Sequence, residues 1–176
     1  MTPMVDAQTD REEPGTVAPE DGAPPSGPAP KRPRDSQRRR VYLAETPQPP
    51  GHRYRDLMDC IAFAEQVVGS LWWMARFPTR DLGRLPRFRP GYGARQAFFH
   101  VDEFGPAITL PRRYRTASVI LHELVHWAQW DDHIAPHGPE FCRVYLDAVT
   151  EFLGAERGQR LADAFAEQRV KVAPAS

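Results

Sequence analysis

The chain has 176 residues, with 23 basic and 23 acidic side chains and a formal net charge of zero. This length suits one domain with a tail. Two cysteines are too few for a disulfide framework or a Cys-rich zinc ribbon, and no apolar run is long enough to span a bilayer. No apolar segment typical of a secretory signal follows Met1. We therefore expect a cytoplasmic protein without membrane partners.

Residues 1–36 are rich in proline and contain almost nothing apolar to bury. Because such a composition is typical of disordered segments, we expect a disordered tail here. The tail leads into a basic cluster, which consists of Lys31, Arg32, Arg34, Arg38, Arg39 and Arg40. Such a cluster is able to contact phosphate groups. No aromatic side chains are interleaved with it for stacking on bases, which favours a solvated lead-in to the domain.

The folded domain is predicted over residues 37–172, with a short tail at 173–176. Its first element is a short strand at Arg40–Ala44, which the prolines of the following TPQPPG would end. A helix is predicted from Tyr54 to Arg76, because apolar residues recur there at steps of three and four. Residues 79–95 are rich in Gly, Pro and Arg, which predicts irregular structure.

Two short strands are then predicted, Ala97–Val101 and Ala107–Leu110, on either side of a turn. This pattern is typical of a hairpin. The next helix is expected to begin near Thr116 or Ser118, either of which is a good N-terminal cap. Two further helices are predicted at about Pro139–Leu153 and residues 156–169. Strands followed by helices in this order predict an α+β domain.

The helix that follows the hairpin carries the clearest functional signal. It contains His122-Glu123-Leu124-Val125-His126, an HExxH motif within an apolar run. Residues four apart lie on the same face of a helix, so both imidazoles can point at one metal ion. Glu123 is close enough to act as the general base for a water molecule. Burying two imidazoles and a carboxylate without partners would cost free energy, which a metal ion avoids. The alternative is a metal-free core helix whose histidines form hydrogen bonds to the backbone or to each other. The motif therefore predicts a zinc site.

A catalytic zinc needs a third protein ligand, and His137 is the favoured candidate. It precedes Gly138 and Pro139, which suit the cap and first turn of a helix, so it would lie on a loop at the start of that helix. Four competing residues remain open as alternatives. They are Asp132, His133, Asp147 and Glu151. His100 stands alone on its strand, which favours a structural or exposed role.

The HELVH motif followed by His137-Gly-Pro-Glu-Phe resembles the SprT-like zinc proteases. The similarity is closer to a group of small zinc metallohydrolases from actinobacteria, and it covers most of residues 37–172. It also includes QRRRVYLAE at 37–45, the segment from Trp72 to Pro78, ITLP at 108–111 and FLG at 152–154.

This resemblance implies that His122, His126 and His137 bind zinc and that Glu123 is the general base. It also implies a zincin-like metalloprotease domain, with a small antiparallel sheet packed against the HExxH helix and the following helices. In zincin folds the strand before the metal helix is an edge that pairs with an extended substrate. By this analogy Ala107–Leu110 would be the edge strand.

The favoured function is hydrolysis of peptide bonds, because three protein ligands leave one zinc coordination position open. The substrate would be a peptide or a protein. The residues considered for stabilising the oxyanion are Arg112, Arg113, Tyr114 and Tyr145. Two other functions stay open. The chain could be a non-catalytic zinc-binding module in which Asp132 fills the fourth position, or a DNA-associated SprT-like protease tethered by the basic cluster.

Overall fold

The computed structural model describes residues 34–78, 85–130 and 134–175. Over these residues the fold is α+β, as predicted, with six α-helices and a three-stranded sheet. The helices are α1 (Arg38–Glu45), α2 (Leu57–Val68), α3 (Leu71–Arg76), α4 (Ala117–Ala128), α5 (Pro139–Leu153) and α6 (Ala155–Glu167). The strands are β1 (Arg87–Pro90), β2 (Phe98–Asp102) and β3 (Gly105–Leu110), and a short 3-10 turn covers Arg112–Tyr114.

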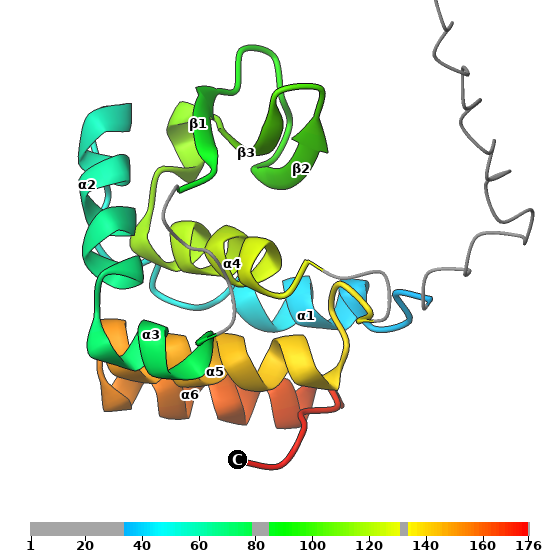
Figure 1. Ribbon diagram of the computed structural model, residues 1–176. Helices are drawn as coiled ribbons and strands as arrows, with labels where there is room; N and C mark the ends of the chain where they lie inside the picture. The colour runs from blue at the N-terminus through cyan, green and yellow to red at the C-terminus, as the bar shows by residue number, and fades with distance from the viewer. Residues whose placement is uncertain (1–33, 79–84, 131–133, 176) are drawn as a thin grey trace, which may run out of the picture.

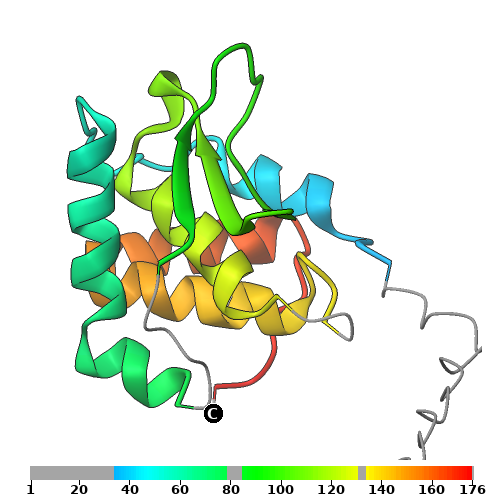
Figure 2. The same ribbon diagram turned by 45° about the horizontal axis from the view of Figure 1, so that its top comes forward.

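Helix α4 lies in the middle of the molecule (Figure 1). The sheet covers one side of it, and α5 and α6 lie on the other, while α1 runs beside it (Figure 2). Nine of the twelve residues of α4 are buried, as the apolar run predicted. Its N-cap is Thr116, whose hydroxyl accepts a hydrogen bond from the backbone N–H of Val119. Burial on every side fixes this helix firmly.

The segment predicted as a strand at Arg40–Ala44 is a helix, α1. Its two buried residues, Val41 and Ala44, are three positions apart, which is the spacing of one helical face. The run of Val, Tyr, Leu and Ala shows no alternation of apolar and polar residues, so it does not distinguish a strand from a helix. The strand prediction was therefore wrong.

The helix predicted from Tyr54 to Arg76 is two helices, α2 and α3, that meet at Gly69 and Ser70. Ser70 starts the second helix, because its hydroxyl accepts a hydrogen bond from the N–H of Trp73. The region predicted to be irregular contains β1, and its residues 79–84 lie outside the described part of the chain.

The predicted hairpin is confirmed, since β2 and β3 pair in antiparallel fashion. The sheet as a whole is mixed, because β1 pairs with the other side of β3 in parallel. Strand β3 is thus central, and the prediction that Ala107–Leu110 forms an edge was wrong. The edge strand beside α4 is β2. The prediction failed because β1, which covers the other side of β3, is a four-residue strand within the Gly-, Pro- and Arg-rich stretch that was predicted to be irregular.

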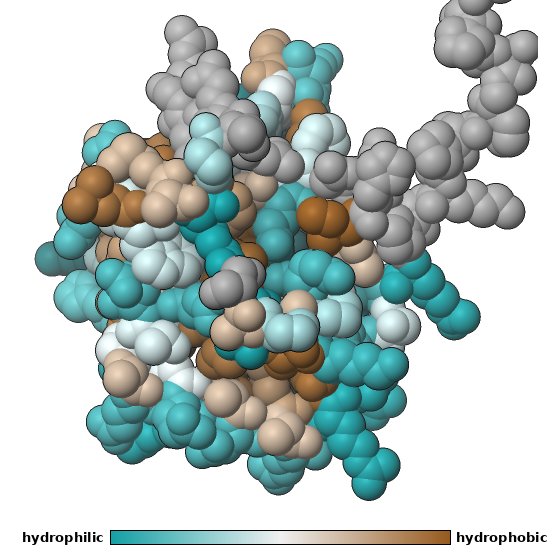
Figure 3. Space-filling view, turned by 60° about the horizontal axis from the view of Figure 1, so that its bottom comes forward, coloured by the Kyte–Doolittle hydropathy of each residue, from teal (hydrophilic) through white to brown (hydrophobic). Residues whose placement is uncertain are grey.

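Helices α5 and α6 agree closely with the prediction, and Pro139 occupies the first turn of α5. The two cysteines, Cys60 and Cys142, are buried and unpaired, as expected. The surface formed by the helical side is mostly hydrophilic (Figure 3). Within the described residues no helix is long and apolar enough to cross a membrane.

The start of α1 is attached to the C-terminal segment through polar contacts. The side-chain amide of Gln37 donates to the carbonyl of Lys171 at 2.9 Å and accepts from its N–H at 2.9 Å. Arg40 donates to the carbonyl of Arg169 at 2.9 Å. These hydrogen bonds join the first residues of the folded domain to residues near its C-terminal end. They hold α1 against the end of α6.

Candidate metal centre

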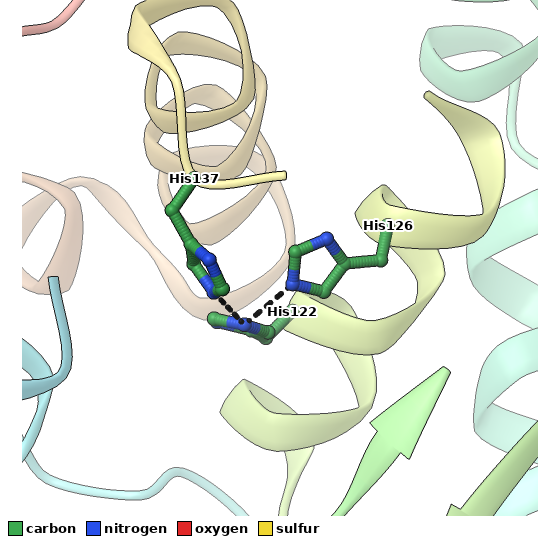
Figure 4. A group of neighbouring side chains, drawn as sticks. All are labelled: His122, His126 and His137. Carbon is green, nitrogen blue, oxygen red and sulfur yellow. Dashed lines mark hydrogen bonds between the residues drawn. The ribbon is translucent and has the colours of Figure 1, made fainter. Parts of the chain in front are cut away.

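Three histidine side chains converge on one point (Figure 4). His122 and His126 lie one turn apart on α4, and His137 lies on the loop that leads into α5. The Nε2 atom of His122 is 3.0 Å from Nε2 of His126 and 3.3 Å from Nε2 of His137. The potential ligand atoms of the three all lie within 4.8 Å of one another. The structure thus brings together all three histidines that the sequence predicted as ligands.

These separations fit a shared metal ion. Two imidazole nitrogens bound to one zinc at about 2.0–2.1 Å in tetrahedral geometry lie about 3.3 Å apart. The observed spacing of 3.0–3.3 Å is close to this value. Three nitrogen donors of this kind suit zinc and other first-row transition metals. The geometry shows a possible metal site and does not select the metal.

The carboxylates next to two of the rings also favour a cation between the rings. Nδ1 of His122 is 2.7 Å from Oε1 of Glu45, and Nδ1 of His137 is 2.8 Å from Oδ2 of Asp35. An ionised carboxylate can only accept, so each Nδ1 must donate its proton. In the neutral rings Nε2 then carries a lone pair, and the two lone pairs face each other. A positive charge between them removes this repulsion.

The surroundings of the three imidazoles shift their pKa values in different directions. Burial holds the pKa of His126 well below its ordinary value, and the nearby His122 lowers it further. Burial also lowers the pKa of His137, which exceeds the opposing effect of Asp35. For His122 burial acts in the same direction, but the Glu45 carboxylate outweighs it and raises the pKa. Metal binding requires the neutral imidazole, which burial favours at His126 and His137, whereas Glu45 favours the charged form of His122.

Glu123 lies beside this cluster and is only 5% exposed. Its Oε2 accepts a hydrogen bond of 2.7 Å from the backbone N–H of Phe99 on β2. Burial raises the pKa of Glu123, against the lowering effects of His122 and of this hydrogen bond. A carboxylate held in this way is a stronger base than one in water.

Aromatic rings surround the imidazoles and restrict their rotation. Phe141 stacks on His126 with ring centroids 4.3 Å apart, and Tyr145 lies edge-on to His122 at 5.2 Å. Tyr42, on α1, stacks over His122 at 5.9 Å and meets His137 edge-on at 5.2 Å. Such packing keeps the rings in position without a bound ligand.

Two cavities adjoin the cluster on either side of Glu123. The larger, about 810 Å³, is lined by Phe99, Glu123, His126 and His137 among others. The smaller, about 520 Å³, is lined by His122, Glu123, Tyr145 and Val149 among others, and most of its wall is apolar. Volumes of this size are typical of sites that admit small molecules or side chains.

The other residues that the sequence offered as ligands are either outside the cluster or not described by the structure. Asp147 binds Arg76 and Arg143 at 3.4 and 3.2 Å, and Glu151 is exposed, so neither belongs to the cluster. Asp132 and His133 lie outside the described residues. His100 lies on β2, with its Nε2 3.7 Å from Asp102.

The basic cluster is partly used within the domain. The guanidinium of Arg38 lies 5.5 Å from the centre of the Tyr42 ring, and Arg40 binds the C-terminal segment. Lys31 and Arg32 lie outside the described residues.

Sequence reasoning missed the contribution of α1 and of the residues just before it. Asp35 was placed in the disordered tail, Tyr42 was assigned to a strand, and Glu45 was given no role. One signal was available: Arg38, Tyr42 and Glu45 recur at steps of four and three, which places them on one helical face.

No family model, no curated protein and no solved structure matches this chain. The resemblance to SprT-like proteases therefore remains a prediction that depends on the motifs alone.

Proposed function

We propose that this protein is a zinc-dependent metallohydrolase of zincin-like architecture that cleaves peptide bonds. The observation that carries the proposal is the convergence of three Nε2 atoms next to a buried glutamate that faces a cavity. Three protein ligands leave a tetrahedral zinc with one open position, which is the arrangement of catalytic sites. When bound, zinc would polarise the carbonyl of the substrate and make water more acidic.

Glu123 would act as general base and then as general acid. Because the N–H of Phe99 holds Oε2, the second oxygen, Oε1, is left to accept a proton from the attacking water. The carboxylate then delivers this proton to the leaving amine. Burial keeps the basicity of Glu123 high, and the strand keeps its orientation fixed.

An extended peptide would bind along β2. This strand has β3 on one side only, and it lies next to α4. The N–H of Phe99 points to Glu123, away from β3, so the backbone of β2 on this side is directed at the candidate centre. An edge strand can pair with an extended substrate and hold a peptide bond near the metal ligands. The substrate rail predicted at β3 is therefore assigned to β2.

Tyr42 is the best-placed residue for stabilising the oxyanion. It lines both cavities and packs against His122 and His137. Of the earlier candidates, Tyr114 and Arg113 donate to the carbonyl of Arg95, and Tyr145 is buried with its hydroxyl directed at the carbonyl of Ser118. A phenol donor is suited to a developing negative charge.

The decisive experiment combines metal analysis with Glu123→Gln. We expect one zinc per chain in both the wild type and the variant, because Glu123 is not a ligand. Hydrolysis of a mixed peptide library should fall about 100-fold or more in the variant. Glu151→Gln, an exposed glutamate on α5, is the matched control and should retain activity. A chain that binds zinc while wild type and Glu123→Gln are equally inactive would favour the non-catalytic module.

A further inference from the structure

Helix α1 brings one carboxylate to each end of the histidine cluster. Asp35 precedes the N-cap residue Gln37, and Glu45 is the last residue of the helix. We propose that Asp35 and Glu45 act together as positioning residues that set the proton and the ring orientation of two metal ligands, which makes α1 part of the metal centre. The inference depends on the proposed function only in that the three histidines bind a metal.

The contacts are short and shielded. Glu45 reaches Nδ1 of His122 at 2.7 Å, and Asp35 reaches Nδ1 of His137 at 2.8 Å. The two imidazole side chains are 4% and 5% exposed. A carboxylate that accepts from Nδ1–H directs the lone pair of Nε2 at the metal and makes that nitrogen a stronger donor. Each carboxylate also adds negative charge close to a divalent cation.

The environment of Asp35 argues against a purely structural role. Its Oδ2 binds His137, but Oδ1 is buried and has no hydrogen-bond partner within the described part of the chain. A buried oxygen without a partner costs free energy. A carboxylate at this position adds negative charge beside His137, and a metal ion beyond the imidazole would compensate this charge.

Helix α1 is anchored independently of the metal. Gln37 and Arg40 bind the backbone of Lys171 and Arg169, and Val41 and Ala44 pack into the core. The carboxylates are thus held in place before a metal arrives. The remaining candidate ligand, His126, has no such carboxylate and is positioned by stacking on Phe141, with ring centroids 4.3 Å apart. Removing the carboxylates should therefore weaken metal binding without removing a ligand.

The test measures zinc affinity in the full chain by competition with a chromogenic chelator. Glu45→Ala and Asp35→Ala should each weaken binding by about 10–100-fold. Glu45→Gln and Asp35→Asn keep an oxygen that can accept from Nδ1–H but lack the charge, so they should restore part of the affinity. The visible spectrum of the cobalt-substituted protein should shift in the alanine variants, since ring orientation changes the ligand field.

Asp147→Asn is the matched control. Asp147 is a half-buried carboxylate on α5 that pairs with Arg76 and Arg143, away from the histidines. Its loss should lower the unfolding temperature and leave zinc affinity and the cobalt spectrum unchanged. If the wild type binds zinc and the Asp35 and Glu45 variants bind equally tightly, the inference is wrong and the three-histidine site stands. If the wild type binds no zinc or cobalt, both proposals fail.

Discussion

Helices α4 and α1 lie side by side at the candidate centre, but they are held in place in different ways (Figure 2). Nine of twelve residues of α4 are buried, whereas α1 buries only Val41 and Ala44 among its eight. Helix α4 carries two of the histidines and is fixed by apolar packing. Helix α1 carries Glu45, follows Asp35 and is fixed largely by polar contacts at its start. Two of the three candidate ligands thus come from the buried central helix, and the carboxylates beside them come from the less buried helix α1 and the residues just before it.

The largest effect is expected from the loss of a ligand on α4. His126→Ala leaves two imidazoles, so we expect the protein to lose bound zinc during gel filtration, an effect larger than any change on α1. Metal analysis of the eluted protein measures this loss. His100→Ala, on β2, is the control and should retain one zinc per chain. Full zinc retention in His126→Ala would place the site elsewhere.

The next prediction compares the loss of stability when a leucine is truncated on each of the two helices. Leu124 on α4 is fully buried, so Leu124→Ala should lower the free energy of unfolding by about 2–5 kcal/mol. Leu43 on α1 is 48% exposed, so Leu43→Ala should change it by less than about 0.5 kcal/mol. Urea denaturation of the metal-free protein measures both values. Equal losses would show that α1 is as deeply anchored as α4.

A smaller effect should follow from detaching α1. Gln37→Ala removes the amide that pairs with Lys171 and should cost about 1–3 kcal/mol if the freed backbone groups stay buried. Hydrogen exchange should accelerate in α1 while α4 stays protected. Gln159→Ala, on the exposed side of α6, should leave both helices unchanged. Uniform acceleration across the domain would mean that α1 does not open separately.

The smallest effect concerns the helix caps. Thr116 caps α4, so Thr116→Ala should destabilise the protein by about 0.5–2 kcal/mol, and Thr116→Ser should restore most of this loss. The side chain of Gln37, at the N-cap of α1, makes no capping bond, so a cap effect is expected for α4 alone. Thermal unfolding compares the three proteins. A Ser variant as unstable as the Ala variant would rule out the cap as the cause.

The parts of the site that depend on local sequence were predictable. The spacing of His122 and His126 follows from helix geometry, and Gly138 and Pro139 mark the start of α5 and so place His137 on a loop. The convergence of all three was inferred from these signals and is confirmed.

The missed parts depend on contacts between distant positions. The Asp35 contact joins residues 102 apart in the sequence, and the Glu45 contact joins residues 77 apart. Nothing in the proline-rich neighbourhood of Asp35 indicates such a partner. Likewise, β1 has only four residues, Arg87–Pro90, with a proline before it and a glycine after it, and it is a strand because it pairs with β3. In both cases contacts between residues far apart in the sequence determine the structure.

The bond between Gln37 and Lys171 spans 134 positions, and this distance has a consequence for biosynthesis. During translation the segment that contains His122 and His126 is made before the backbone that receives Gln37. The hydrogen bonds that attach the start of α1 therefore form only after the segment that contains Lys171 has been made. The placement of Glu45 and Asp35 beside the histidines thus depends on a contact that the histidine segment does not supply.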